Sequence, residues 1–123
     1  MTTPEPRRRI LIVDDEPLIT EVLSEHFKSD FDVETALSGT DALTAIVRQR
    51  PDLVLLDINM PRMNGLELLR RIKAESGLAK IPVVIVTTEG KEEDTVAGLR
   101  AGAAAYVRKP FQHGEILGII ARL

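Results

Sequence analysis

The chain has 123 residues, a formal net charge of −3, no cysteine and no tryptophan. This length fits a single domain that can bury a core of its own. The lack of cysteine excludes a disulfide scaffold, thiol nucleophiles and thiolate metal ligands, and the mild acidity argues against nucleic-acid binding by this domain. No apolar run approaches the ~20 residues that span a bilayer, and no signal-peptide core opens the chain, so we expect a cytoplasmic protein without membrane contact.

Short apolar runs alternate along the chain with segments whose apolar residues recur at helical spacing. Residues 1–9, with Pro4 and Pro6, are interpreted as a flexible leader before one domain over residues 10–123. Strands are predicted at Ile10–Val13, Phe31–Leu37, Leu53–Leu56, Val83–Val86 and Ala104–Val107, and helices at Leu18–Phe27, Ala42–Val47, Gly65–Lys73, Glu92–Ala101 and Gln112–Leu123. The fourth helix is expected to be weak because Gly98 interrupts it. Five alternations of this kind indicate an α/β fold, a parallel sheet with helices on both faces.

Polar and charged residues follow the apolar runs at the ends where function is found in open α/β sheets. Asp14 and Asp15 follow the first strand, Asp57 the third, Thr87 the fourth and Lys109 the fifth. An aspartate after a strand is often only a helix N-cap, which is the preferred interpretation of Asp15 or Glu16 taken alone. Taken together, these residues predict one cluster at a single edge of the sheet.

Carboxylates gathered at one edge repel each other unless a cation neutralises them. Oxygen ligands without histidine or cysteine suit Mg²⁺, or Mn²⁺. With the Lys109 ammonium and the Thr87 hydroxyl nearby, such a site would hold the three oxygens of a phosphoryl group. Asp57 is then the candidate nucleophile, giving an acyl phosphate.

Two other classes with an α/β sheet were weighed against this interpretation. A phosphatase of the haloacid dehalogenase type needs a second aspartate two residues after its nucleophile, and this chain has Asn59 there. A flavin carrier of the flavodoxin type needs a Ser/Thr/Gly-rich phosphate loop after the first strand, where this chain has acids instead. Turnover of a generic phosphoester would favour the first alternative, and a yellow protein the second.

The chain resembles the receiver domain of bacterial two-component response regulators, within it the single-domain chemotaxis type, from Ile10 to the last helix. The resemblance rests on several motifs that occur in the family's order and spacing. These are Ile10–Val13 with Asp14, Asp15 and Glu16, then Asp57–Gly65 (DINMPRMNG), Pro82–Thr87, Ala101–Ala103 and Lys109–Phe111.

The resemblance implies a flavodoxin-like (βα)5 doubly wound sheet with strand order 2-1-3-4-5. It implies that Asp57 is the phosphoacceptor, that Asp14, Asp15, Asp57 and the Asn59 carbonyl hold Mg²⁺, and that Thr87 and Lys109 contact the phosphoryl oxygens. Thr87 and Tyr106 would be the switch residues, and Asn59 and Glu89 would tune the lifetime of the phosphate.

The implied function is a phosphorylation-activated signalling switch, not a conventional turnover enzyme. Its partners would be a sensor histidine kinase or a histidine phosphotransfer domain upstream, and a downstream protein or a C-terminal output domain. The surface that changes would be formed by the fourth helix, the fifth strand and the fifth helix.

Overall fold

The computed structural model of the chain describes residues 8–58, 65–88, 92–109 and 113–122. Strands and helices alternate throughout, as the sequence predicts. The elements are β1 Arg9–Val13, α1 Pro17–Phe27, β2 Asp32–Ala36, α2 Gly39–Arg48, β3 Leu53–Asp57, α3 Gly65–Ala74, β4 Val83–Thr88, α4 Glu92–Arg100, β5 Ala105–Lys109 and α5 His113–Ala121.

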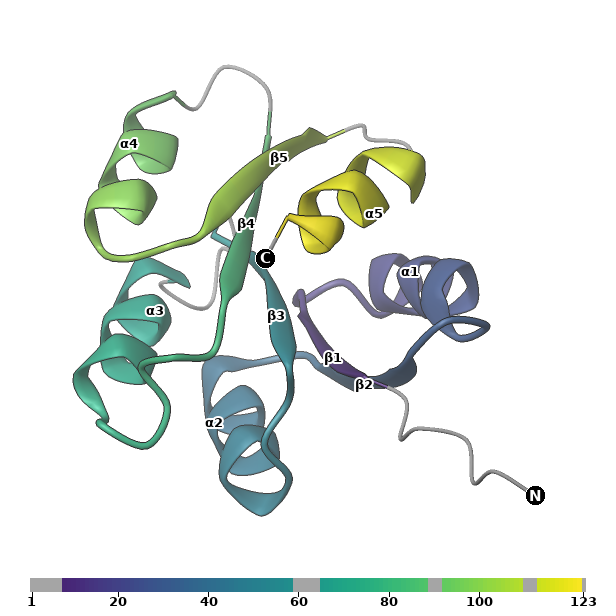
Figure 1. The fold of residues 1–123 in the computed structure, drawn as a ribbon, viewed down its shortest axis with the longest axis horizontal. Helices are drawn as coiled ribbons and strands as arrows, with labels where there is room; N and C mark the ends of the chain where they lie inside the picture. The colour runs from purple at the N-terminus through teal and green to yellow at the C-terminus, as the bar shows by residue number, and fades with distance from the viewer. Residues whose placement is uncertain (1–7, 59–64, 89–91, 110–112, 123) are drawn as a thin grey trace.

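The five strands form one sheet in the order β2-β1-β3-β4-β5, and every neighbouring pair is parallel (Figure 1). The predicted strand order and fold class are therefore confirmed. The central strands β1 and β3 are almost entirely buried, whereas the edge strand β2 is largely exposed or half-buried. This difference explains why β1 and β3 read as unbroken apolar runs and β2 as a weaker one.

Helices cover both faces of the sheet, and each face has its own buried core (Figure 1). On one face α1 and α5 pack against the sheet, with Phe27 and Ile116 fully buried. On the other face lie α2 and α3, whose Ile46 and Leu69 are fully buried, together with α4, whose Gly98 lies against Ile85 of β4. A doubly wound arrangement of this kind leaves the carboxyl ends of the strands free to carry a site.

Helix ends follow local chemistry. Pro17 begins α1, where its missing N–H costs nothing. Ser38 caps α2, its side-chain oxygen accepting a hydrogen bond from the Asp41 N–H at 3.1 Å.

Helix α4 ends in a turn that has the Schellman pattern of hydrogen bonds. The Gly102 N–H donates to the Leu99 carbonyl and the Ala103 N–H donates to the Gly98 carbonyl. Gly102 has a φ of +111°, in the region that favours glycine. The expected interruption at Gly98 is wrong, because α4 is continuous through that residue.

Most observed boundaries differ slightly from the predicted ones. β1 begins at Arg9, inside the predicted leader, while residues 1–7 lie outside the described residues. Both β3 and β5 run further than expected, so Asp57 and Lys109 are the last residues of their strands. None of the helices in the described ranges has the length and apolar character that a bilayer crossing requires.

Candidate functional site

The strand register places the predicted site residues at one edge of the sheet. Val13 of β1 lies opposite Leu56 of β3, so the next residues, Asp14 and Asp57, lie side by side at the strand ends. Both side chains are buried, Asp14 being 2% and Asp57 5% exposed. Two acidic side chains at adjacent buried positions are costly in a fold unless they have partners or a cation.

Asp57 also has a defined neighbour on its other side. It lies opposite Val86 of β4, so Thr87 is the next residue along that strand. Thr87 in turn lies opposite Arg108 of β5, and Thr88 lies opposite Lys109. The backbone thus brings the ends of β1, β3, β4 and β5 to the edge where the sequence predicts them.

The turn after β1 gathers three carboxylates. Oxygen atoms of Asp14, Asp15 and Glu16 all lie within 4.8 Å of one another. The turn is shaped by Asp14, whose Oδ1 accepts a hydrogen bond from the Glu16 N–H at 3.0 Å. Its own N–H donates to the Ala36 carbonyl of β2 at 3.1 Å, which anchors the turn to the sheet. A set of hard oxygen ligands like this one suits a divalent cation such as Mg²⁺.

Glu16 is the member of this group that the sequence analysis interpreted as a helix N-cap and did not include among the metal ligands. It stands at the N-cap position of α1, and its carbonyl accepts hydrogen bonds from the Ile19 and Thr20 N–H groups. Its side chain makes no capping hydrogen bond, so the carboxylate is not used to begin the helix. Asp57, by contrast, is not a member of the group of three carboxylates. The sequence signal for Glu16 was the run of three consecutive acids directly after a buried strand.

The chain turns closely behind Asp57. A Cβ added to Gly65, the first residue of α3, would lie 2.7 Å from the Ile58 Cα and 2.9 Å from the Asp57 carbonyl oxygen. The Ile58 N–H donates to the Val86 carbonyl at 3.3 Å, which continues the strand pairing past Asp57. Only glycine allows α3 to begin this close to the backbone of Asp57. Asn59 and Glu89, the predicted lifetime residues, lie outside the described residues.

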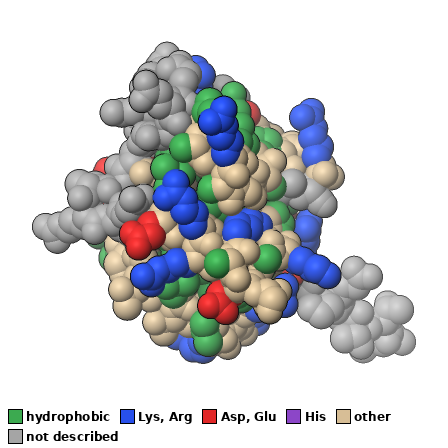
Figure 2. Space-filling model, turned by 90° about the vertical axis from the view of Figure 1, so that its left-hand side faces the viewer, with side chains coloured by type: hydrophobic (Ala, Val, Ile, Leu, Met, Phe, Trp, Pro, Cys, Tyr) green, Lys and Arg blue, Asp and Glu red, His purple; other side chains and the backbone are tan. Residues whose placement is uncertain are grey.

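The face covered by α4 carries apolar side chains that point to solvent. Tyr106 of β5 is 40% exposed, and Val96 and Leu99 of α4 are exposed to a similar degree. Figure 2 shows the side of the molecule that bears α3 and α4, where hydrophobic side chains lie between Lys and Arg side chains. Exposed basic residues of these helices include Arg70, Arg71 and Arg100. Asp and Glu side chains also lie on this face (Figure 2), and Glu67 pairs with Arg71. A surface that mixes apolar side chains with arginine and other charged residues is suited to contact with another protein.

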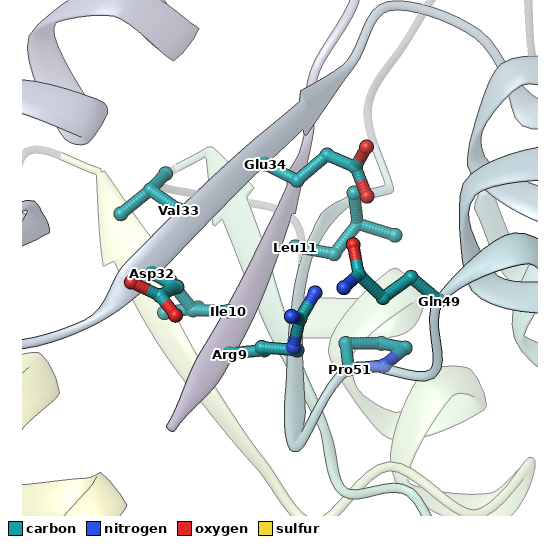
Figure 3. A pocket seen from close by; sticks show the side chains of 8 residues that line it. All are labelled: Arg9, Ile10, Leu11, Asp32, Val33, Glu34, Gln49 and Pro51. Carbon is teal, nitrogen blue, oxygen red and sulfur yellow. The ribbon is translucent and has the colours of Figure 1, made fainter. Parts of the chain in front are cut away.

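A cavity of about 300 Å³ lies away from these residues, at the amino ends of β1 and β2 (Figure 3). It is lined by Arg9, Ile10, Leu11, Asp32, Val33, Glu34, Gln49 and Pro51. The acidic cluster follows the carboxyl end of β1, the opposite end of that strand, so the cavity is not part of the site.

Comparison with known proteins identifies the family of this chain. Residues 10–121 match the family model described as response regulator receiver domain. The chain therefore belongs to the response regulator receiver domain family, a class of signalling proteins in two-component systems and not of metabolic enzymes.

Individual relatives are of two kinds. The DNA-binding response regulator MtrA of Mycolicibacterium smegmatis is 43% identical over 119 residues, which are 95% of this chain and 51% of the relative. The DNA-binding regulator RpaA of Synechocystis is 34% identical over 94% of this chain and 48% of its own. The chain thus spans about half the length of these curated relatives. The solved structure of chemotaxis response regulator CheY4 of Vibrio cholerae has a TM-score of 0.85 at 31% identity, over 94% of this chain and 98% of that one.

Proposed function

We propose that this chain is a phosphorylation-controlled signalling switch in which Asp57 accepts a phosphoryl group. The observation that carries this proposal is the placement of buried Asp57 beside Asp14, whose carboxylate lies within 4.8 Å of those of Asp15 and Glu16. The donor would be a phosphohistidine on a sensor histidine kinase or on a histidine phosphotransfer domain. Membership of the receiver family supports both assignments.

The chemistry follows from a carboxylate nucleophile. One oxygen of Asp57 attacks phosphorus, the P–N bond to the histidine ring breaks, and its electron pair returns to the ring nitrogen. The product is an acyl phosphate on Asp57. Thr87 would donate its hydroxyl to a phosphoryl oxygen and Lys109 would pair its ammonium with the added charge. Their support is the strand register, in which Thr87 follows the residue opposite Asp57 and Lys109 ends β5, the next strand of the same sheet edge.

The carboxylates fit a magnesium ion, which we place among Asp14, Asp15 and Asp57 with the Asn59 carbonyl. The fit rests on the donor set, since the cluster holds hard oxygen atoms. When bound, the ion would supply positive charge that offsets the repulsion between the carboxylates and the incoming phosphoryl group. The structure adds Glu16 to the cluster. Its carboxylate would hold the ion either directly or through a bound water.

Intact-mass measurement tests the proposal. After incubation with acetyl phosphate and Mg²⁺, the protein should gain one phosphate, and Asp57→Asn should gain none. Asp30→Asn is the matched control, because Asp30 is an exposed aspartate of the α1–β2 connection, and it should be phosphorylated like the wild type. An Asp57→Asn protein that still gains the phosphate would refute the assignment, and many turnovers of a generic phosphoester would favour a phosphatase instead.

The metal assignment has its own test. Asp14→Asn and Asp15→Asn should raise the Mg²⁺ concentration needed for half-maximal phosphorylation by about 10-fold or more, as the loss of a metal ligand or its orienting group does. Glu16→Gln tests the third carboxylate in the same way, since either direct ligation or contact through water would shift that concentration. Equal Mg²⁺ requirements for all three variants and the wild type would refute the site.

We further propose that the signal leaves through α4, β5 and α5. Tyr106 is the switch residue of this surface, and its half-exposed ring can move between an outer and an inner position. The partner is a downstream protein or an output domain, and we assign any DNA contact of a longer protein to such a domain. The exposed apolar residues of α4 and β5 support a protein partner.

The lifetime of the phosphate is assigned to Asn59 and Glu89, which flank the phosphoacceptor and Thr87 in the sequence. A polar and an anionic side chain there bind or orient the water that hydrolyses the acyl phosphate. The half-life of the purified phosphoprotein in Mg²⁺ should then change in Asn59→Ala and Glu89→Ala. A wild-type protein that stays phosphorylated for hours would contradict the proposed short-lived signal.

A further inference from the structure

Helix α4 approaches the sheet closely at Gly98, where an added Cβ would meet the side chain of Ile85. A Cβ added to Gly98 would lie 1.9 Å from the Ile85 Cδ1 and 3.4 Å from the Ile85 Cγ1. It would also contact the Leu66 side chain of α3, at 3.6 Å. Glycine lowers the helix propensity of an interior position, so its presence in α4 is compensated by this packing.

Ile85, the residue that packs against Gly98, lies opposite Tyr106 in the sheet. Ile85 is 0% exposed, and in the parallel register of β4 and β5 it lies opposite Tyr106. Residues that lie opposite each other project from the same face of a sheet. Helix α4 therefore lies on the face from which both Ile85 and Tyr106 project, and Tyr106 is the one of the two that remains exposed.

We infer that Gly98 is the positioning residue that seats α4 on Ile85 and thereby keeps the Tyr106 ring outside. The inference rests on the proposed function, because it assigns a conformational role to the surface through which the signal leaves. A methyl group at position 98 would push α4 away from β4. The widened space between α4 and β5 then admits the Tyr106 ring.

The added methyl group moves the helix in preference to the strand. β4 is hydrogen-bonded on one side to β3 and on the other to β5. Ile85 belongs to a buried core cluster, where close packing limits the rotation of its side chain. Helix α4 is a nine-residue element whose outer face, with Val96 and Leu99, is exposed. The helix is thus the part that can shift.

The test uses the fluorescence of the protein without any phosphorylation. The chain has one tyrosine and no tryptophan, so its intrinsic emission reports Tyr106 alone. In Gly98→Ala the Stern–Volmer constant for quenching by acrylamide should fall by about twofold, as an outer-to-inner population shift requires. Gly118→Ala is the matched control, because Gly118 lies in helix α5 with nothing within 4 Å of an added Cβ, and it should leave the constant unchanged.

Rescue by a second substitution separates this role from a general loss of packing. Ile85→Val removes the Cδ1 that the new methyl group would meet, so the double variant Gly98→Ala/Ile85→Val should regain the wild-type constant. An unchanged constant in Gly98→Ala means that Ile85 rotates instead, and overturns the inference. A lowered constant that the double variant does not restore overturns it as well.

Folding failure would not leave the question open. If Gly98→Ala is unfolded by circular dichroism, a folded double variant with the wild-type constant supports the contact, and an unfolded double variant overturns it. Because Asp57 plays no part in these measurements, failure of the inference is distinguishable from failure of the proposed phosphorylation.

Discussion

The replacement of Gly65 by alanine tests how tightly the fold holds the phosphoacceptor candidate. The new Cβ would lie 2.7 Å from the Ile58 Cα, 2.9 Å from the Asp57 carbonyl oxygen and 3.1 Å from the Ile58 Cγ2. Two of these three atoms belong to the backbone and cannot rotate away as a side chain can. Either the backbone of Asp57 and Ile58 or the first turn of α3 must therefore shift by several tenths of an ångström.

The expected loss of stability combines two opposing effects. Overpacking of this kind costs about 1–3 kcal/mol. Alanine recovers part of that, up to about 1 kcal/mol, because it restricts the unfolded chain more than glycine does. The free energy of unfolding should fall by about 1–2 kcal/mol, which lowers the Tm of a domain of this size by roughly 5 °C.

Urea and thermal unfolding measure the free energy of unfolding. The rate of labelling by acetyl phosphate measures the reactivity of Asp57. Gly118→Ala should move the stability in the opposite direction, by about 0.5–1 kcal/mol, because Gly118 is an exposed helix position without close neighbours. Gly65→Ala should also incorporate phosphate more slowly at temperatures where it is fully folded. A Gly65→Ala protein as stable as the wild type and labelled at the same rate would refute the argument.

Three further predictions concern the helix ends, the α3–β4 connection and the metal. Ser38→Ala removes the oxygen that accepts from the Asp41 N–H and should lower the free energy of unfolding in urea by about 1 kcal/mol. Lys73→Met removes the Nζ that donates to the Ala79 and Ile81 carbonyls and should cost about 1–3 kcal/mol. Burial lowers the pKa of the Lys73 ammonium below 10.5. The folded state therefore binds this proton less tightly than the unfolded chain does. The free energy of unfolding of the wild type, relative to that of Lys73→Met, should thus grow as the pH rises toward 10.5. Mg²⁺ at ten times its Kd should raise the free energy of unfolding by about 1.4 kcal/mol, an increase that EDTA should abolish in thermal scans.

The fold was predictable because each level of the sequence points to the same answer. The buried strands β1 and β3 are apolar except for Arg9 at the start of β1 and Asp57 at the end of β3. The helices between strands have apolar residues at helical spacing. The boundaries of the strands were less predictable, because the residue that ends a strand can be polar. Asp57 belongs to β3 although its side chain is a carboxylate, because its backbone pairs with Val86 of β4.

Glycines are where the sequence alone was misleading. Gly98 has the low helix propensity that predicts an interruption, yet α4 runs through it because the tertiary contact with Ile85 outweighs that propensity. Gly65 begins its helix as predicted, but the atoms that require glycine there, the Ile58 Cα and the Asp57 carbonyl oxygen, are visible only in three dimensions. Helix propensity describes an isolated segment, whereas both glycines are explained by close contact with a neighbouring element.

The acidic site illustrates the same limit from the side of electrostatics. The strand ends predict that Asp14 and Asp57 lie together, and the register places them side by side. The sequence does not predict that the Asp14 side chain would hold the Glu16 N–H and so turn the Glu16 carboxylate toward Asp14 and Asp15. That turn gathers three negative charges before any phosphoryl group arrives, so the proposed cation must bind there first for Asp57 to react at a useful rate. The rate of phosphorylation should therefore saturate with Mg²⁺, and the Mg²⁺ midpoint should fall as acetyl phosphate is raised toward saturation, because a donor that binds only the metal-loaded protein draws the metal equilibrium toward the bound form. An undiminished rate in EDTA, or a midpoint that rises with the donor, would contradict this order of binding.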